Sequence, residues 1–397
     1  MRVAYVCADP GVPVFGSKGA SIHVTEVLRV LVARGARVDL FCRRVGGDPP
    51  PGLSGVRVRR LPAVTARDAA GRERELLGQA RQIEAVVRTG GPYDLVYERY
   101  SLWNAATMAW ARSAGVPAVL EVNAPLVDEQ AEHRTLVHRD EALSVLRVAA
   151  LCASAVVCVS EPVAHWVRSV AGPAASVLVQ PNGVDVERFR PALRRGRHPY
   201  TVGFVGTLKP WHGVGVLADG FALLAHECPD ARLLVVGDGP EAPALRAALE
   251  RSGCAGSAEL TGAVPAAEIP GLLRRMDVAT APYPADAGRY FSPLKVYEYL
   301  AAGLPVVVSR TGQLPAILRD GVDGVLVPPG DPAALARELI RLRHDPDRRH
   351  RLGRAARAGA ERHHTWRAVV SRTLAAAGVG DRGTGDRLGG LAVSEAV

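Results

Sequence analysis

Three lysines stand out among the basic residues of this chain. The 397 residues include 49 lysines and arginines, and only Lys18, Lys209 and Lys295 are lysines. An ammonium is a compact point charge with three rotatable donors, whereas a guanidinium is a planar fork, so the two groups are not equivalent beside a phosphate. Lys18 and Lys209 lie in glycine-rich turns, and Lys295 lies at the start of a predicted helix. We interpret all three as candidate phosphate contacts; chance survival in an arginine-rich composition is the alternative.

The segment FSPLKVYEYLAAGLPVVVS predicts a helix N-terminus that could bind an anion. Ser292 suits the N-cap, and Pro293 suits the first helical position. The backbone amides of Leu294 and Lys295 would then point out of the helix, where its dipole favours negative charge. Glu298 lies about one turn further on, where a carboxylate can accept hydrogen bonds from ribose hydroxyls. The alternative is a capped helix with a surface glutamate.

Predicted strands and helices alternate along the chain in two blocks, as in parallel α/β domains. Each block opens with a strand, a turn containing one lysine, a helix and another strand; the turns are DPGVPVFGSKGAS and TLKPWHG. Because ligands bind at the carboxyl ends of parallel strands, both turns would face one cleft. We expect an N-terminal domain over 1–185, a C-terminal domain over 186–362, a helix over 363–377 packing back toward the N-terminal domain, and a flexible tail over 378–397.

Composition argues against several other classes of protein. The net charge is +9, but the arginines are mixed with acids along helices, so neither nucleic-acid binding nor contact with a membrane surface is indicated. Six cysteines without Cys-x-x-Cys spacing are interpreted as reduced thiols of a cytoplasmic protein. The longest apolar run, 148–159, is too short to span a bilayer. Neither an Asp-x-Asp spacing nor a histidine cluster argues for a metal, so we predict neither a metal nor another cofactor.

The order of the motifs resembles that of the retaining glycosyltransferases of family 4, which have the GT-B fold. The motifs are QPNGVDVERFRP, GFVGTLKPWHG, VVGDGPE, LTGAVPAAEIPGLLRRMDVATAPY and PLKVYEYLAAGLPVVVSRTGQLPAILRDGVDGVLVPPGDPAALA. The resemblance covers about residues 1–377. It implies two Rossmann-like domains facing a central cleft, with a nucleotide-diphosphate sugar held mainly by the C-terminal domain. It also implies front-face transfer, in which the departing phosphate oxygen takes the acceptor proton.

The resemblance assigns donor contacts to the C-terminal domain, where this chain departs from the usual residues. The family's basic pair at the diphosphate falls on Thr207 and His212, so Lys209 is the expected substitute and a protonated His212 could assist. Glu298 matches the second glutamate of the family's spaced pair, which binds ribose. The first glutamate of that pair falls on Tyr290, which leaves open how the sugar hydroxyls are held.

Further contacts are expected on both sides of the cleft. Gly16 and Gly19 would let the N-terminal loop approach the diphosphate, with Lys18 facing phosphate or acceptor. Asn123 stands where the family often has a histidine that touches the donor sugar. The backbone of Val264 could contact the base. The expected donor-sugar contacts are Asn123, Tyr290, Ser292 and Pro293.

We therefore predict a glycosyltransferase that moves a sugar from a UDP- or GDP-linked donor to a hydroxyl of an unidentified acceptor, either a small molecule or lipid-linked. Lys209 and Glu298 are the candidate catalytic residues, and Glu98 and Glu121 are possible acceptor contacts. Two alternatives remain open: a nucleotide-sugar epimerase of the same fold, and a nucleotide-sugar binding protein without activity.

Overall fold

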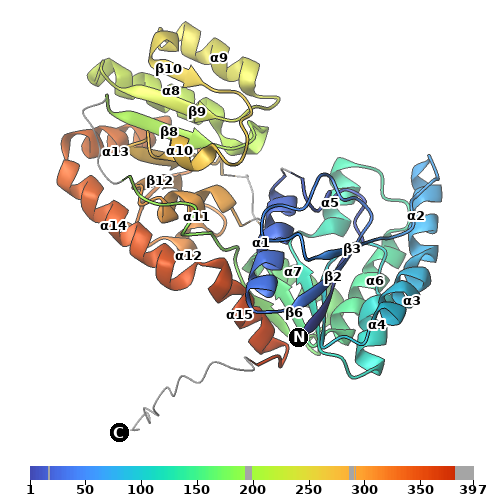
Figure 1. Ribbon diagram of the computed structural model, residues 1–397. Coiled ribbons are helices and arrows are strands. Elements are labelled where there is room, and N and C mark those ends of the chain that lie inside the picture. Colours follow the sequence, from blue (N-terminus) through green and yellow to red (C-terminus); the bar gives the residue numbers. More distant parts are fainter. Residues whose placement is uncertain (17, 193–198, 286–289, 291, 381–397) are drawn as a thin grey trace, which may run out of the picture.

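Two parallel β-sheets organise the chain, as the computed structural model shows (Figure 1). The structure describes residues 1–16, 18–192, 199–285, 290 and 292–380. In this part of the chain the first sheet has seven strands in the order β3-β2-β1-β4-β5-β6-β7, and the second has six in the order β10-β9-β8-β11-β12-β13. The prediction of two parallel α/β domains is confirmed. Most of the expected tail, from residue 381 on, lies outside the described residues.

The first sheet and its helices cover residues 2–179. Its strands are β1 Arg2–Cys7, β2 Arg37–Cys42, β3 Arg57–Arg60, β4 Leu95–Arg99, β5 Ala118–Val122, β6 Ala155–Cys158 and β7 Val177–Val179. Its helices are α1 Gly19–Ala33, α2 Ala69–Gly78, α3 Ala80–Gly90, α4 Ala106–Ser113, α5 Leu126–His133, α6 Arg139–Cys152 and α7 Glu161–Ala171.

The second sheet and its helices follow from residue 201. Its strands are β8 Thr201–Val205, β9 Arg232–Val236, β10 Ala258–Leu260, β11 Val278–Ala281, β12 Val306–Ser309 and β13 Val325–Val327. Its α-helices are α8 Val214–Glu227, α9 Ala242–Arg251, α10 Ile269–Leu273, α11 Leu294–Ala301, α12 Leu314–Ile317, α13 Pro332–His344 and α14 Pro346–His363. Short 3₁₀ turns lie at Pro210–His212 and Ala255–Ser257.

The strand order places a ligand-binding crevice in each domain. Strands such as β5 (AVLEV) and β12 (VVVS) are buried along their whole length, as expected for parallel strands covered by helices on both faces. In the first sheet the order reverses between β1 and β4, and in the second between β8 and β11. Ligands bind beyond the carboxyl ends of the strands at such reversals, so the loops after β1 and β8 are the first places to search.

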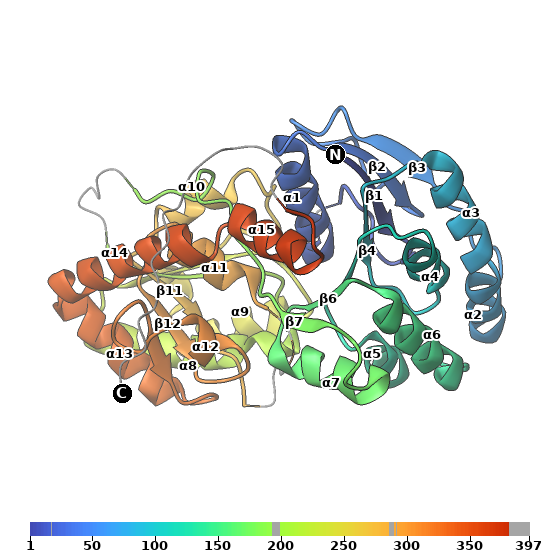
Figure 2. The ribbon, with the colours of Figure 1, turned by 90° about the horizontal axis from the view of Figure 1, so that it is seen from below.

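The last helix crosses back onto the first domain. Helix α15, Trp366–Ala376, packs against α1, and Trp366, Val370 and Leu374 are buried in the core beneath the first sheet (Figure 2). Its N-terminus is capped by Thr365, whose hydroxyl accepts a hydrogen bond from the amide of Ala368. The two domains are therefore joined twice, once by the linker after β7 and once by α15.

Candidate active site

A cavity of about 1680 Å³ opens between the two domains. Most of its wall comes from the loops after β1, β4 and β5, including Asp9, Arg99, Tyr100 and Asn123. The second domain contributes Pro210, Trp211, Pro284 and Tyr290. The cavity therefore lies at the carboxyl ends of the strands, where the topology places a ligand. Of the predicted site residues, Lys18, Asn123 and Tyr290 line it.

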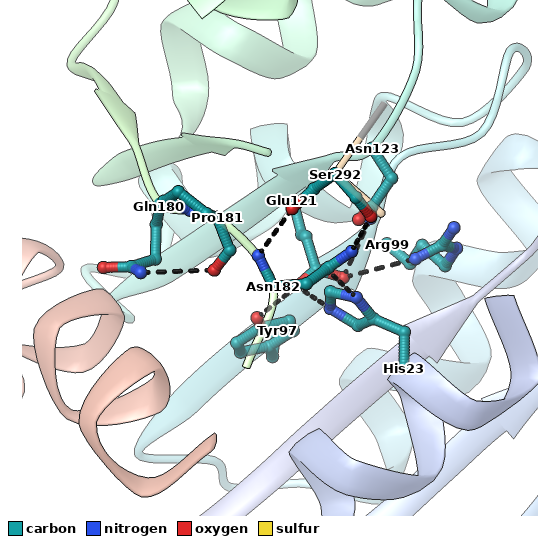
Figure 3. Close-up of polar contacts among 9 residues, drawn as sticks. All are labelled: His23, Tyr97, Arg99, Glu121, Asn123, Gln180, Pro181, Asn182 and Ser292. Carbon is teal, nitrogen blue, oxygen red and sulfur yellow. Dashed lines mark hydrogen bonds and ion pairs between the residues drawn. The ribbon is translucent and has the colours of Figure 1, made fainter. Parts of the chain in front are cut away.

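A buried carboxylate lies below this cavity at the end of β5 (Figure 3). Glu121 accepts hydrogen bonds from Tyr97 Oη at 2.7 Å, His23 Nε2 at 2.7 Å and Asn123 Nδ2 at 3.1 Å. Arg99 Nη1 lies 3.5 Å from its second oxygen. Burial alone would raise the pKa of Glu121, but His23, Arg99 and the tyrosine hydroxyl outweigh it and hold that pKa at about 2.

Both ring nitrogens of His23 have hydrogen-bond partners. Its Nε2 lies 2.7 Å from Oε1 of Glu121. Its Nδ1 lies 2.8 Å from Oδ1 of Asn182, whose Nδ2 donates to the carbonyl of Ser292 at 2.8 Å. His23 thus joins the buried carboxylate of the first domain to the linker and, through it, to the start of α11.

The same network fixes the start of α11. The amide of Asn182 donates to the hydroxyl of Ser292 at 3.1 Å, so that oxygen accepts its hydrogen bond from the linker. Helix α11 begins at Leu294 with Pro293 in the cap position, and a proline side chain cannot cap it. The prediction of Ser292 as the cap and Pro293 as the first helical residue is therefore wrong by one position. Across the cleft, a β-carbon at Gly19 would lie 3.7 Å from Leu294, so the N-termini of α1 and α11 face each other.

The side chain of Lys295 is enclosed in the second domain. Its Nζ has no hydrogen-bond partner among the described residues and lies 4.1 Å from the centre of the Phe204 ring and 5.7 Å from that of Tyr283. A β-carbon at Gly206 would come within 2.7 Å of this nitrogen. Burial lowers the pKa of Lys295 to about 7, although Glu298 opposes that change. The structure thus places an unpartnered amine directly beneath the turn that follows β8.

Glu298 lies on the same helix, away from the cavity wall. Burial raises its pKa to about 7, and the nearby Arg188 and Lys295 only partly offset this effect. Its role at the ribose stays a prediction. Val264 packs against the core of the second domain and is not among the residues that line the cavity.

The turn after β8 presents its predicted residues in different directions. Thr207 is exposed, and Lys209 extends over the ring of Trp211, with Nζ 5.8 Å from the ring centre. His212 turns inward, and its Nδ1 donates to the carbonyl of Thr207. Burial, together with the charge of Lys295, lowers the pKa of His212 to about 4. In the free protein the ring is therefore neutral at physiological pH, and assistance by a protonated His212 at a bound diphosphate stays a prediction.

Tyr290, in the position of the family's first glutamate, contacts the first domain. Its hydroxyl donates to the carboxylate of Glu129 on α5, and its carbonyl accepts a hydrogen bond from Ser160 at 2.5 Å. Lys18 occupies the cap position of α1 and is exposed. Gly16 is required by its own turn, because a β-carbon there would lie 2.9 Å from the ring of Pro13.

The two glutamates expected to contact an acceptor are instead buried. Glu98 is 0% exposed and Glu121 is 3% exposed, although one oxygen of Glu98 has no hydrogen-bond partner among the described residues. Glu98 accepts a hydrogen bond from Asn104 at 2.7 Å, and burial raises its pKa to about 8 despite that bond. The expectation of acceptor contacts from these residues is wrong, since both carboxyls are closed off from the cavity.

The roles of His23 and Asn182 in this network were not predicted from the sequence. The only signal for His23 was a polar residue among the apolar positions of a predicted helix, beside Val24 and Val27. Asn182 resembled an ordinary turn residue in PNG. Their importance depends on three distant segments meeting at one point, which no local pattern displays.

Comparisons with known proteins agree with this geometry. The family model for glycosyl transferases group 1 matches residues 199–345, and the model for glycosyltransferase family 4 matches residues 17–188. A D-inositol 3-phosphate glycosyltransferase of Salinispora tropica is 30% identical over 412 residues, covering 90% of this chain and 80% of the relative.

Solved structures share the architecture. Anabaena HepE in complex with UDP aligns with a TM-score of 0.69 at 20% identity, covering 94% of this chain and 100% of that one. The same protein in complex with UDP-glucose aligns with a TM-score of 0.66 at 19% identity over 94% and 98% of the two chains. Sucrose-phosphate synthase from Thermosynechococcus elongatus gives 0.70 at 21% identity over 95% and 99%. At these identities the likeness establishes the GT-B fold.

Proposed function

Because the chain belongs to the retaining glycosyltransferases of family 4, we propose that it transfers a sugar from a UDP-linked donor to a hydroxyl of a small polar acceptor held in the interdomain cavity. The single observation that carries the proposal is the meeting of two helix N-termini beside that cavity, with an unpartnered amine behind one of them. The ligands of the Anabaena structures, UDP and UDP-glucose, support uridine over guanosine.

The donor diphosphate would lie between the N-termini of α1 and α11. The amides of Leu294 and Lys295 point toward this gap, and Gly19 brings the opposite helix close without a side chain. Glu298 would bind the ribose hydroxyls. As the bond from the sugar to the phosphate breaks, negative charge accumulates on the diphosphate, and donors already in place stabilise it.

The acceptor would occupy the part of the cavity built by the first domain. Its wall carries charges of both signs, including Arg72, Arg134, Asp9 and Glu132, together with the ring of Tyr100. Such a wall suits a hydroxyl-rich molecule better than a lipid tail. The Salinispora relative is a D-inositol 3-phosphate glycosyltransferase, which supports an acceptor of that size.

The reaction needs no protein nucleophile. The bond between the anomeric carbon and the phosphate oxygen breaks, the acceptor oxygen bonds to the same face of that carbon, and its proton passes to the departing phosphate. His23 does not take part in this transfer, because both of its ring nitrogens are already hydrogen-bonded within the protein. A cytoplasmic location also remains a proposal, and it is supported by six free cysteines.

A donor screen followed by a turnover assay tests the proposal. UDP or a UDP-sugar at 100 times its Kd should stabilise the protein by about 2.7 kcal/mol in thermal unfolding, whereas GDP should not. With the sugar identified, UDP should be released only when a polyol acceptor is added. Sugar interconversion without acceptor would indicate an epimerase, and binding without turnover across an acceptor panel would indicate a protein without transferase activity.

A further inference from the structure

The turn after β8 lacks the charges that this family uses at the diphosphate. Thr207 carries none, and the ring of His212 is neutral, since burial and the charge of Lys295 hold its pKa near 4. Lys209 remains in the turn, but it is half-buried and its Nζ lies over the ring of Trp211, 5.8 Å from the ring centre. A departing diphosphate still requires compensation of its charge, so another cation has to be close to this position.

Lys295 has the features expected of that cation. Its Nζ is enclosed, and no described residue accepts a hydrogen bond from it. An amine buried without a partner is destabilising by an amount comparable to a lost hydrogen bond or more, so such groups are rare and call for an explanation. The rings of Phe204 and Tyr283 offset part of that penalty by holding the ammonium over their faces.

The amine is also in the right place. It lies where β8 ends, and it belongs to the first turn of α11, whose free amides point toward the same gap. Gly206, with φ of +143°, forms the wall between the amine and the turn. A β-carbon there would lie 2.7 Å from Nζ, so the amine packs directly against the backbone of the turn. The end of β8, the first turn of α11 and the amine therefore lie close together.

We propose that the side chain of Lys295 binds the leaving diphosphate, in place of the arginine and lysine that the family carries at positions 207 and 212. The inference rests on the proposed function, because it requires a nucleoside diphosphate at this end of the sheet. It adds a side-chain contact to the amides that the helix terminus already offers.

Binding of a diphosphate beside Lys295 should change the protonation of its amine. In the free protein the groups around Nζ are Glu298 on its own helix, neutral His212 on the turn and Tyr283 after β11. Burial lowers the pKa of Lys295 to about 7, so at pH 8 the amine is largely neutral. A diphosphate at its side would favour the ammonium and raise that pKa. Binding of UDP at pH 8, where its terminal phosphate is already fully ionised, should therefore take up close to one proton.

Isothermal titration calorimetry with UDP in two buffers of different ionisation enthalpy measures this uptake directly. Lys295→Met keeps the length of the stem over Phe204 but removes the charge. It should abolish proton uptake at pH 8, weaken UDP binding by about 10–100-fold and lower kcat by about 10²–10³-fold. Adding Thr207→Arg to Lys295→Met should recover affinity without proton uptake. Arg251→Met, which removes one charge at the end of α9, is the matched control and should change neither.

Three outcomes separate the possibilities. If the wild-type protein binds UDP at pH 8 without proton uptake, the amine does not meet the diphosphate and the inference is overturned. The same holds if Lys295→Met, with an unchanged circular dichroism spectrum, binds UDP as tightly as wild type. If the wild-type protein binds no UDP at all, the proposed function fails first, and the inference fails with it. The wild-type measurement decides the question even if the Lys295 variant does not fold.

Discussion

Two buried glutamates on adjacent strands should respond oppositely to the same substitution. Glu98 on β4 and Glu121 on β5 point to opposite faces of the first sheet, because Arg99 is the residue in register with Glu121. On one face, Glu121 meets the ring of His23 and the guanidinium of Arg99. On the other, Glu98 meets only neutral groups, and one of its oxygens has no partner among the described residues.

The pKa values of the two glutamates determine how much each substitution should change the stability. Burial raises the pKa of Glu98 from 4.5 to about 8, so at pH 7 folding must protonate a carboxyl that is ionised in the unfolded chain. At 1.36 kcal/mol for each pH unit above 4.5, this costs about 3 kcal/mol at pH 7. Glu98→Gln removes that penalty and keeps an oxygen to accept from Asn104. We expect the variant to gain about 1–3 kcal/mol at pH 7, because the amide must still be buried.

Glu121→Gln should have the opposite effect. The pKa of Glu121 is held at about 2, so its ionised form stabilises the fold above pH 4.5, and this stabilisation is lost as the pH falls toward 2. Removing the charge leaves His23 and Arg99 buried without a counter-charge. Breaking one side of a buried ion pair in this way costs about 3–5 kcal/mol.

Urea unfolding at pH 5, 7 and 8 is the deciding measurement, with midpoints compared at constant slope. Because the folded-state pKa of Glu98 is raised, its contribution to stability is present below pH 4.5 and is lost as the pH rises to 8. The advantage of Glu98→Gln should therefore be small at pH 5 and largest at pH 8. An advantage that stays constant with pH, or a loss of stability at pH 8, would refute the reasoning, since the ionisation of Glu98 would then not matter.

Three further predictions concern the second domain. Glu298→Gln should weaken UDP binding several-fold in calorimetry without lowering the melting temperature, and an unchanged Kd would remove Glu298 from the site. Lys209→Ala should raise the donor KM more than it lowers kcat, because solvent screens a half-exposed charge over Trp211. Salt should therefore change the kinetics of the wild-type enzyme more than those of the variant, and equal effects of low and high salt on both would contradict this. Gly213→Ala should destabilise the protein by about 1–3 kcal/mol in thermal unfolding, because φ is +66° there and a β-carbon would overlap the carbonyl oxygen of Pro282; a neutral result would show that the turn yields easily.

The fold was largely predictable because its determinants are local. Continuous apolar runs identify the buried parallel strands, and the glycine-rich turns identify where the chain reverses toward a helix. The last helix, expected over 363–377, runs over Trp366–Ala376. The predicted start of α11 was one residue too early, because the hydroxyl of Ser292 accepts a hydrogen bond from the amide of Asn182, more than a hundred positions away in sequence.

The site was predictable only in part, because charge states depend on three-dimensional neighbours. In sequence, Glu98 and Glu121 are both single acids in apolar strands, and nothing local distinguishes a carboxyl with a raised pKa from one with a lowered pKa. The difference arises from the face of the sheet to which each points and from the arrival of His23 on α1. Similarly, His212 resembles a cation in sequence, but the aromatic and cationic groups around it keep it neutral.

The three lysines of this chain also differ in their three-dimensional surroundings. Lys18 is exposed at the start of α1, Lys209 is half-exposed on the turn, and Lys295 is enclosed. Only the enclosed position constrains the residue type. Between the ring of Phe204 and the wall at Gly206, a compact ammonium fits, whereas a planar guanidinium would need space that the turn occupies. This steric limit explains why position 295 is a lysine in a chain whose other basic residues are nearly all arginines. A residue on α11 is also held by the packed helix, so a cation there is positioned before the donor binds, as stabilisation of a developing charge requires.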